Sequence, residues 1–365
     1  MAAGRVMIAG ALAAIVLLIA IRRARGAEDE ELDGPALYRE ACASCHGADG
    51  RGATGTAVTV PLPDFTDCGF NTREPDSDWG YVVARGGAAA GLSPQMPAFT
   101  GALTPEETHR VLAYVRSFCT DGWWPRGELN FRRPIFTGKA FPEDETVATQ
   151  SFIKGPGSTA NWVTELSIEQ RIGARGQFEL TLPIEVRDPS GGSTEAGVGD
   201  LSLNGQYVLY ASLQHLTIVA ASLELVLPSG DRDRGLGDGT VTFEPSLLAG
   251  TGLLDPIVLQ AQLQGVAPVD EHRADSGVRF LSAASYPLGP LRRDWWPTLE
   301  FEARQNVSAG ESEFFLTPEI YKAIRTRGHV AMSLGVQLPI GGRRPFDYNI
   351  VGFLLWEYGD GGLWW

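Results

Sequence analysis

The sequence of 365 residues predicts a multidomain chain, in which a small all-α domain precedes an antiparallel β-barrel of about 12 transmembrane strands. Three observations predict this fold class. Up to about residue 120, apolar residues recur at helical spacing. From residue 146 onward, apolar and polar residues alternate, which is the pattern of strands. The connections between those strands are alternately long and short, as in barrels of the outer membrane.

The first segment, residues 1–26, is predicted to be a signal peptide or an N-terminal anchor. The apolar run Val6–Ile21 follows Arg5 and precedes a group of arginines that begins at Arg22. A run of this length is typical of a signal-peptide core and is short for a bilayer span. The arginines behind the run favour an uncleaved anchor. Both interpretations place the following domain outside the cytoplasm.

The first domain depends on the motif Cys42-Ala-Ser-Cys45-His46. The spacing C-x-x-C-H is the attachment signature of a c-type haem, with both cysteines as thioethers and the histidine as an axial iron ligand. A redox disulfide and half of a zinc site are the alternatives. A redox motif does not need His46, and the sequence has no second C-x-x-C or paired histidines to complete a zinc set. The motif therefore predicts one covalent haem c and a role in electron transfer.

Helical periodicity predicts three helices in this domain: 34–43, 77–84 and 105–118. The last helix has a clear start, because Thr104 is a good N-cap, Pro105 suits the first turn and Glu107 completes a capping box. The chain after His46 is rich in glycine, as backbone packed against a flat macrocycle often requires. These features predict a compact helical domain around the haem.

The motifs of this domain resemble those of class I cytochromes c. They are C-x-x-C-H, the loop Ser93-Pro-Gln-Met96-Pro-Ala-Phe99, and a helix that starts with Leu103-Thr-Pro-Glu-Glu107 and ends with Tyr114-Val-Arg-Ser117. The resemblance covers residues 34–120 and implies that His46 and Met96 are the axial ligands. Such ligation leaves no open iron position, which favours an electron carrier over a catalyst. The rival ligand, His109, lies within the last helix and is interpreted as a surface residue.

The net charge and the cysteine content limit the possible partners of the protein and the cellular compartment in which it folds. The formal net charge of −14 argues against nucleic acid as a partner. Cys68 and Cys119 remain outside the haem motif, and a disulfide between them is expected in an oxidising compartment. Two buried free thiols are the alternative, because the sequence does not supply the Cα separation that a disulfide needs.

Residues 121–145 are predicted to be a linker, residues 146–358 the barrel, and residues 359–365 a C-terminal tail. Prolines and alternating charge indicate that the linker is an extended connector. The predicted strands are 146–154, 161–172, 177–187, 200–211, 216–227, 240–249, 256–265, 278–287, 295–305, 312–321, 329–339 and 347–358. An even number of strands places both ends of the barrel, and with them the haem domain, on the periplasmic side.

A water-soluble β-sandwich is the alternative to the barrel. Its strands average five or six residues, whereas most of the predicted segments are about twice as long, which favours the barrel. The barrel also resembles a porin-like outer-membrane family associated with phenol-degradation (meta-pathway) clusters. The motifs that carry this resemblance are Gly197–Leu201, Leu225–Asp233, Gly235–Leu247, Leu316-Thr-Pro-Glu319, Gly335–Ile340, Phe346-Asp-Tyr348 and Leu355–Tyr358. The resemblance covers about 160–358 and implies a transport-like role.

The two predicted parts together suggest what the chain does. A ring of twelve strands is about 24 Å across, so a domain of about 30 Å would cap the periplasmic mouth or hang from it. Acidic residues predicted to face the lumen would favour cations such as metal ions, or serve as ordinary polar lining. They are Glu165, Glu169, Glu179, Glu185, Glu224, Glu244, Glu300 and Glu302.

Three functional hypotheses follow. The first is an outer-membrane electron relay between a periplasmic redox carrier and a donor or acceptor at the pore, in plan similar to single-haem cytochrome–porin proteins that oxidise extracellular iron. The second is an uptake channel for a small organic or metal substrate, with an accessory cytochrome. The third is a soluble periplasmic carrier with a β-rich binding module. Outer-membrane lipid is an expected partner in the first two.

Overall fold

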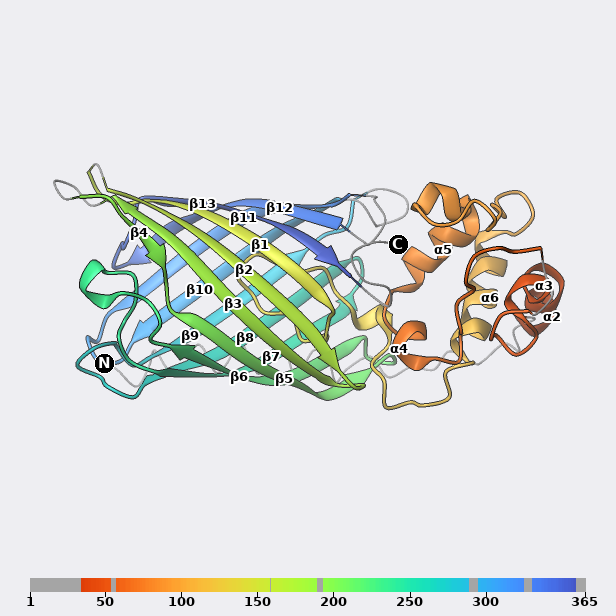
Figure 1. Ribbon diagram of the computed structural model, residues 1–365, viewed down its shortest axis with the longest axis horizontal. Helices are drawn as coiled ribbons and strands as arrows, with labels where there is room; N and C mark the ends of the chain where they lie inside the picture. Colours follow the sequence, from red (N-terminus) through yellow and green to blue (C-terminus); the bar gives the residue numbers. More distant parts are fainter. Residues whose placement is uncertain are drawn as a thin grey trace.

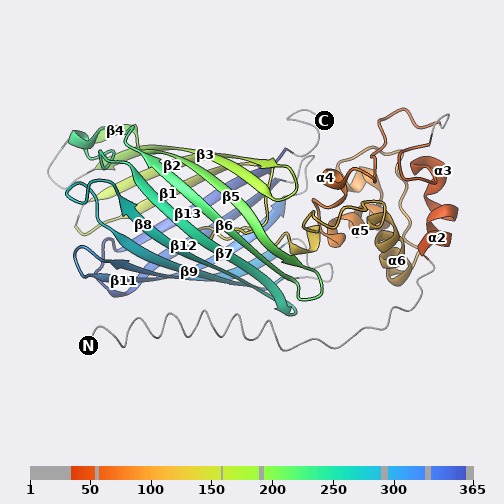
Figure 2. The ribbon, with the colours of Figure 1, turned by 90° about the horizontal axis from the view of Figure 1, so that it is seen from below.

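The computed structural model describes residues 34–53, 57–157, 159–188, 193–288, 295–324 and 330–358. They form a helical domain beside one end of a long barrel (Figures 1 and 2). The predicted leader (1–26) and tail (359–365) lie outside these residues. Within the described ranges, no helix combines the length and the hydropathy that a bilayer span requires. The predicted fold class, a small all-α domain followed by an antiparallel barrel, is confirmed.

The helices of the first domain are α2 (Gly34–Ala41), α3 (Ala43–His46), α4 (Cys68–Asn71), α5 (Asp76–Arg85) and α6 (Pro105–Arg116), with a 3-10 turn η1 (Gly87–Ala90). The predicted capping box starts α6, because Thr104 Oγ1 accepts the Glu107 N–H at 3.1 Å and Glu107 Oε2 accepts the Thr104 N–H at 2.8 Å. Tyr38 of α2 is buried against Val111 and Val115 of α6. All three predicted helices are therefore present, as α2, α5 and α6, and the short α3, α4 and η1 were not predicted.

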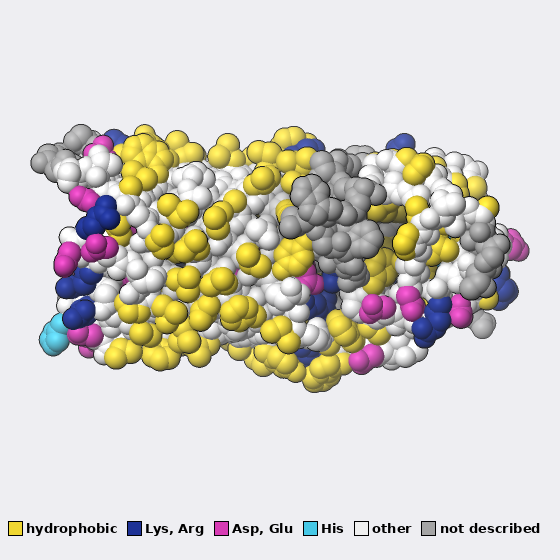
Figure 3. All heavy atoms as spheres, in the orientation of Figure 1, with side chains coloured by type: hydrophobic (Ala, Val, Ile, Leu, Met, Phe, Trp, Pro, Cys, Tyr) yellow, Lys and Arg dark blue, Asp and Glu magenta, His cyan; other side chains and the backbone are white. Residues whose placement is uncertain are grey.

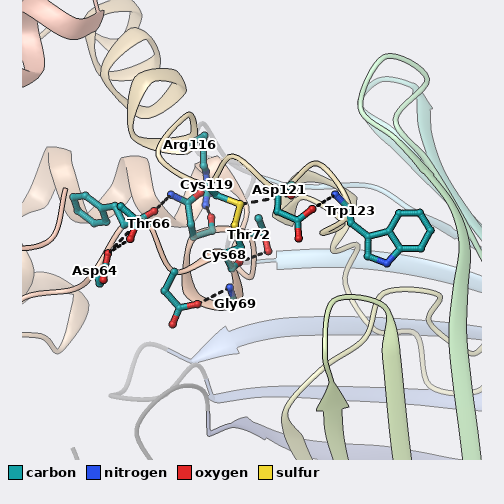
Figure 4. The surroundings of a disulfide bond; sticks show 12 residues. Asp64, Thr66, Cys68, Gly69, Thr72, Arg116, Cys119, Asp121 and Trp123 are labelled. Atoms are coloured by element: carbon teal, nitrogen blue, oxygen red, sulfur yellow. Dashed lines mark hydrogen bonds between the residues drawn. A yellow bond between two sulfur atoms is a disulfide. The ribbon is translucent and has the colours of Figure 1, made fainter. Parts of the chain in front are cut away.

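The predicted disulfide between Cys68 and Cys119 is confirmed, with 5.0 Å between the two Cα atoms (Figure 4). It joins the start of α4 to the residues just after α6. The alternative of two free thiols is wrong. The bond therefore fixes the C-terminal end of the helical domain, from which the chain continues toward the barrel.

Replacing both Cys68 and Cys119 with serine is expected to lower the free energy of unfolding of this domain by roughly 2–4 kcal/mol. The reason is that the disulfide closes a segment with a sequence separation of 51 residues, which constrains the unfolded chain. Urea titrations of the full chain, followed by haem absorbance, measure the change. Wild-type protein in reductant should match the double variant, and an unchanged midpoint in both would contradict the prediction.

The strands of the barrel are β1 (Glu145–Lys154), β2 (Ala160–Ile172), β3 (Gly176–Asp188), β4 (Glu195–Val198), β5 (Leu201–Ser212), β6 (Thr217–Leu227), β7 (Thr242–Leu254), β8 (Ile257–Pro268), β9 (Gly277–Ser285), β10 (Trp295–Asn306), β11 (Ser312–Ile324), β12 (Val330–Gly342) and β13 (Tyr348–Glu357). Chain neighbours pair antiparallel, and β1 pairs with both β2 and β13, which closes the ring. The short β4 pairs only with β3. Among the described residues the ring therefore has 12 strands, as predicted.

The apolar side of the sheet faces outward. Along β2, Leu166 and Ile168 are 40% and 51% exposed, whereas Ser167 and Glu169 are 8% and 3% exposed. Hydrophobic side chains likewise cover the face of the barrel in Figure 3, and charged ones gather at the end away from the helical domain. A β-sandwich would bury its apolar face against a second sheet, but the described strands form one closed sheet. The sandwich alternative is therefore wrong.

The chain enters and leaves the barrel at the mouth that carries the helical domain, because β1 starts there and β13 finishes there (Figure 1). The short turns between β2 and β3, β5 and β6, and β7 and β8 lie at this same end. The longer connections, such as the one between β6 and β7, lie at the opposite end. The helical domain and both chain ends of the barrel therefore lie at one end, as the even number of strands predicted, and the periplasmic position of that end stays a prediction.

The segment 129–144 enters the lumen of the barrel at this end, and we call it the plug segment. The sequence predicted only an extended connector here. Instead, Leu129, Phe131, Ala140 and Phe141 are buried among lumen-facing side chains of the barrel. The prolines and charges of the segment concealed this packing, because its partners are far away in the sequence. Apolar residues spaced through the segment were the available signal.

Candidate haem site and its junction with the barrel

One turn of the chain carries the predicted attachment motif. Cys42 is the N-cap residue of α3, and the His46 N–H donates to the Cys42 carbonyl at 2.9 Å. Cys42 and Cys45 are both free thiols and partly exposed. Burial raises the pKa of the Cys42 thiol to about 11. The structure therefore brings together three of the four predicted site residues in the form that haem attachment requires.

The His46 imidazole is partly buried beside an aromatic ring. It stacks on Phe65, with 4.9 Å between ring centroids. Its Nδ1 is buried and has no hydrogen-bond partner among the described residues. Burial also lowers the pKa of His46, which favours the neutral imidazole that can bind a metal. A partly buried neutral imidazole next to two free thiols fits a covalently attached haem with His46 as an iron ligand.

The glycines after the motif allow the backbone to fold back closely over it. Gly50 and Gly52 have φ values of 77° and 86°, in the left-handed region that glycine adopts readily. The Gly52 N–H donates to the His46 carbonyl at 2.8 Å. A Cβ on Gly50 would lie 3.0 Å from the Phe118 ring, and one on Gly52 would lie 3.1 Å from Leu62. These glycines therefore allow close packing against neighbouring side chains, and their packing against a macrocycle stays a prediction.

Met96 lies on a separate loop that is fastened to the end of α5. The Gly87 N–H donates to the Met96 carbonyl at 3.0 Å, and the Met96 N–H donates to the Ser93 carbonyl at 3.2 Å. A Cβ on Gly87 would lie 2.1 Å from the Ser93 carbonyl oxygen, so only glycine fits there. The loop is thus held in place, with Met96 partly exposed. His109 is exposed on α6, which agrees with its interpretation as a surface residue.

The plug segment packs against opposite walls of the lumen. On one side, Leu129, Phe131 and Phe141 belong to a buried cluster with residues of β5 to β8, namely Val208, Ile218, Ala220, Leu248 and Val258. On the other side, Ile135 packs on a cluster from β1 and β11 to β13, namely Val147, Tyr321, Ala331, Phe353 and Leu355. Trp296 packs against both clusters. The plug segment therefore makes apolar contact with both walls of the lumen at the end near the helical domain.

Polar side chains of the barrel wall bind the backbone of the plug segment. The Glu300 carboxylate accepts the N–H groups of Ile135, Phe136 and Thr137 at 2.7–3.2 Å. It also accepts the Thr137 hydroxyl at 2.6 Å. Further bonds join wall glutamines to the segment: Gln262 to Gly138, Gln260 to Arg132, Gln206 to Ala140 and Gln177 to Glu143. The plug segment is therefore held by specific contacts as well as by apolar packing.

Two ion pairs join the helical domain to this region. Arg73 and Asp144 lie 2.8 Å apart, with side chains 13% and 8% exposed. Arg132 and Asp78 lie 3.2 Å apart and are buried to a similar degree. The Asn130 side chain also donates to the Arg73 carbonyl at 3.2 Å. The helical domain therefore caps the mouth of the barrel through the plug segment, as the size argument anticipated.

Replacing Asp144 with alanine is expected to weaken this junction by about 1.5–3 kcal/mol, because the hydrogen-bonded ion pair with the buried Arg73 guanidinium would be lost. The matched control is Asp64→Ala in the helical domain. Its pair with Arg51 is 42% and 60% exposed and is worth about 1 kcal/mol or less. Hydrogen exchange of the junction should rise in the first variant only. Equal effects of both substitutions would contradict the prediction.

The predicted lumen acids face the interior, since their chain neighbours are exposed on the outside. Strand register joins several of them in one row around the wall: Glu145, Glu169, Glu179, Asn204, Glu224 and Glu244. Arg133 of the plug segment pairs with Glu169, and Glu302 pairs with Arg279 and Arg304. These pairs favour a structural lining role at those positions. A preference of the lumen for cations stays a prediction.

Residues 29–115 match the family model described as cytochrome c oxidase, cbb3-type, subunit III. This part of the chain is a cytochrome c domain. A cytochrome c domain implies a covalent haem c and electron transfer, as the motif predicted. The matched residues include the C-x-x-C-H turn and most of α6. No curated protein is similar in sequence to the chain.

The barrel that follows the cytochrome c domain resembles outer-membrane channels. An outer-membrane channel from Pseudomonas putida F1 is 10% identical, with a TM-score of 0.48, over 62% of this chain and 99% of the channel. The KdgM porin is 10% identical, with a TM-score of 0.41, over 59% and 99%. The NanC porin is 8% identical, with a TM-score of 0.41, over 58% and 98%. The predicted plan, a cytochrome c domain followed by an antiparallel β-barrel, is confirmed by the family match and by the closed sheet.

Proposed function

We propose that the protein is an electron relay of the outer membrane. In this proposal a c-type haem in the cytochrome c domain exchanges electrons with a periplasmic carrier and with a donor or acceptor at the barrel. The bound haem supplies a one-electron iron couple. The observation that carries the proposal is the plug segment, because it joins the haem domain to the barrel and packs inside the lumen beneath it.

The residues of the haem site have distinct roles in this proposal. Cys42 and Cys45 hold the haem through thioethers, so the cofactor stays attached outside the cytoplasm. His46 and Met96 would bind the haem iron, and two such protein ligands would leave no iron position open to a substrate. Phe65, stacked on the imidazole, helps to exclude water from it. These roles favour electron transfer over catalysis at the iron.

The competing function is an uptake channel with an accessory cytochrome. Solute uptake needs a continuous aqueous path, whereas apolar side chains of the plug segment meet opposite walls of this lumen. The plug segment is also covalently part of the chain, between α6 and β1. Electron transfer needs no such path. The packed lumen therefore supports the relay over the channel.

The haem domain is proposed to lie on the periplasmic side. Outer-membrane barrels place short turns and both chain ends of the barrel on that side. Here both of these features occur at the end capped by the cytochrome c domain. Periplasmic electron carriers would then reach the haem domain directly, and donors or acceptors outside the cell would meet the opposite mouth.

Reconstitution of the full holoprotein in sealed liposomes tests the relay. Ferrous iron, added on the side of the long connections, is expected to reduce the haem without passage of a small sugar. Sugar flux that persists after loss of the haem would support the channel instead. Haem reduction that requires lysis of the liposomes would contradict a relay across the barrel.

A further inference from the structure

Trp123 lies in the stretch between α6 and the plug segment, beyond the disulfide and beside strands of the barrel (Figure 4). Its side chain is large and apolar, yet the residue is 55% exposed. Three contacts fix its position. The Arg175 guanidinium lies 3.8 Å from the ring centroid, Arg175 Nε donates to the Trp123 carbonyl at 2.9 Å, and the Trp123 N–H donates to Asp121 Oδ1 at 2.9 Å. An exposed indole that is held by three contacts indicates a binding surface.

The outer surface next to Arg175 is apolar right up to the turn. Arg175 lies in the short turn between β2 and β3. Ile172, just before the turn, is 60% exposed, and Leu209 and Leu213 near the next turn are 54% and 41% exposed. Arg175 Nη1 reaches the Leu209 carbonyl at 3.4 Å. The lipid-facing belt of the barrel therefore extends to this rim, and the Trp123–Arg175 pair continues it.

Residues of this type at the edge of an apolar belt have a known physical preference. Tryptophan combines a large apolar ring with one N–H donor, and such rings gather at the boundary between hydrocarbon and water. Arginine places its carbon chain on apolar surface while the guanidinium remains at the polar boundary. We propose that the Trp123–Arg175 pair is a membrane-interface anchor, which binds the phospholipid surface and fixes the cytochrome c domain against the bilayer. The proposal rests on the proposed outer-membrane location.

The anchor is connected to the haem domain by a short and constrained path. The Asp121 side chain accepts the Trp123 N–H, and the Asp121 carbonyl oxygen lies 3.7 Å from Cys119 Sγ. Cys119 is bonded to Cys68 at the start of α4 (Figure 4). An indole held in the interface would therefore limit the tilt of the domain. It would also set the height of the haem above the membrane.

The adjacent Trp124 has a different environment and provides a matched control. The Arg171 guanidinium lies 4.9 Å from the centroid of the Trp124 ring. The same guanidinium lies 5.4 Å from the centroid of the Phe141 ring in the plug segment. Trp124 is only partly exposed. A probe on Trp123 is therefore expected to sense lipid, whereas a probe on Trp124 is expected to sense the protein around it.

The test uses the full holoprotein labelled with 5-fluorotryptophan, with the haem reduced, in nanodiscs of phosphatidylethanolamine and phosphatidylglycerol. Trp123→Phe and Trp124→Phe each remove one fluorine resonance and so assign it among the nine tryptophans. A lipid with a spin-labelled headgroup is expected to broaden the Trp123 resonance strongly, and more than a water-soluble gadolinium chelate does. The Trp124 resonance should change little with either agent.

Broadening of the Trp123 resonance by the aqueous agent alone would overturn the anchor, as would equal responses of both tryptophans to the lipid. Flotation of the protein with vesicles separates this result from a failure of the proposed location. If the protein does not float, the outer-membrane proposal itself is wrong. If it floats and Trp123 responds only to the aqueous agent, the relay stands and the anchor does not.

Discussion

Replacing Glu300 with alanine is expected to open the barrel to small solutes. The carboxylate accepts hydrogen bonds from three consecutive backbone N–H groups of the plug segment and from the Thr137 hydroxyl, and it is 2% exposed. Hydrogen bonds to a charged group are worth about 1.5–3 kcal/mol each. A loss of about 3 kcal/mol would raise the displaced population of the plug segment roughly 100-fold. Sugar-dependent swelling of liposomes measures the opening.

The matched control for Glu300 is Glu302, two residues along β10 and on the same face. It is 3% exposed, but its partners are Arg279, Arg304 and Gln337 of the barrel wall. Glu302→Ala removes a buried carboxylate without touching the plug segment, so it should leave the liposomes tight. Heat-modifiable migration in gels verifies that both variants keep a folded barrel. Equal swelling with both variants would mean that loss of any buried acid, rather than release of the plug segment, opens the lumen.

Replacing Met96 with alanine is expected to change the haem more than any other single substitution that keeps it attached. Cys42, Cys45 and His46 remain, so one covalent haem per chain should still be found. Loss of the thioether sulfur ligand should lower the reduction potential by on the order of 0.1 V, because methionine ligation raises the potential of c-type haems. It should also allow the reduced iron to bind carbon monoxide. Potentiometric titration and absorbance with carbon monoxide measure both effects.

His109→Ala is the control for Met96, because His109 is exposed on α6 and was the rival ligand. The reduction potential of the His109→Ala variant should equal that of the wild type. Its reduced iron, like that of the wild type, should not bind carbon monoxide. If His109→Ala binds carbon monoxide and Met96→Ala does not, the assignment of the sixth ligand is wrong. Loss of haem from Met96→Ala without any change of potential in the retained fraction would contradict the ligand role as well.

Features that depend on near neighbours in the chain could be predicted from the sequence. The C-x-x-C-H turn is one, because two thiols and an imidazole within one turn of α3 need only local backbone geometry. The capping box at Thr104 is another, since both of its hydrogen bonds span three residues. The strands are a third, because alternation along each strand separates the lipid face from the lumen face. The pairing of Cys68 with Cys119 was predicted from chemistry alone, and the fold supplied the Cα distance.

The plug segment could not be predicted in the same way. Its apolar residues are separated by prolines and charges and have no regular period, so no secondary-structure signal marks them. Its partners are distant, for example 165 residues between Ile135 and Glu300. The same holds for the junction, where Arg73 and Asp144 are 71 residues apart. Such contacts depend on how the ring closes, which no local pattern records.

By itself, the sequence determined that this protein has a helical domain with a haem-attachment turn and an alternating barrel, because these follow from residue spacing over a few positions. Only the tertiary structure decided that the connector packs inside the lumen, that Glu300 binds its backbone, and that Trp123 is exposed beside Arg175. The physical reason is that closing the ring sets the register of every strand. That register brings side chains from distant strands around one segment, at positions that no local pattern specifies.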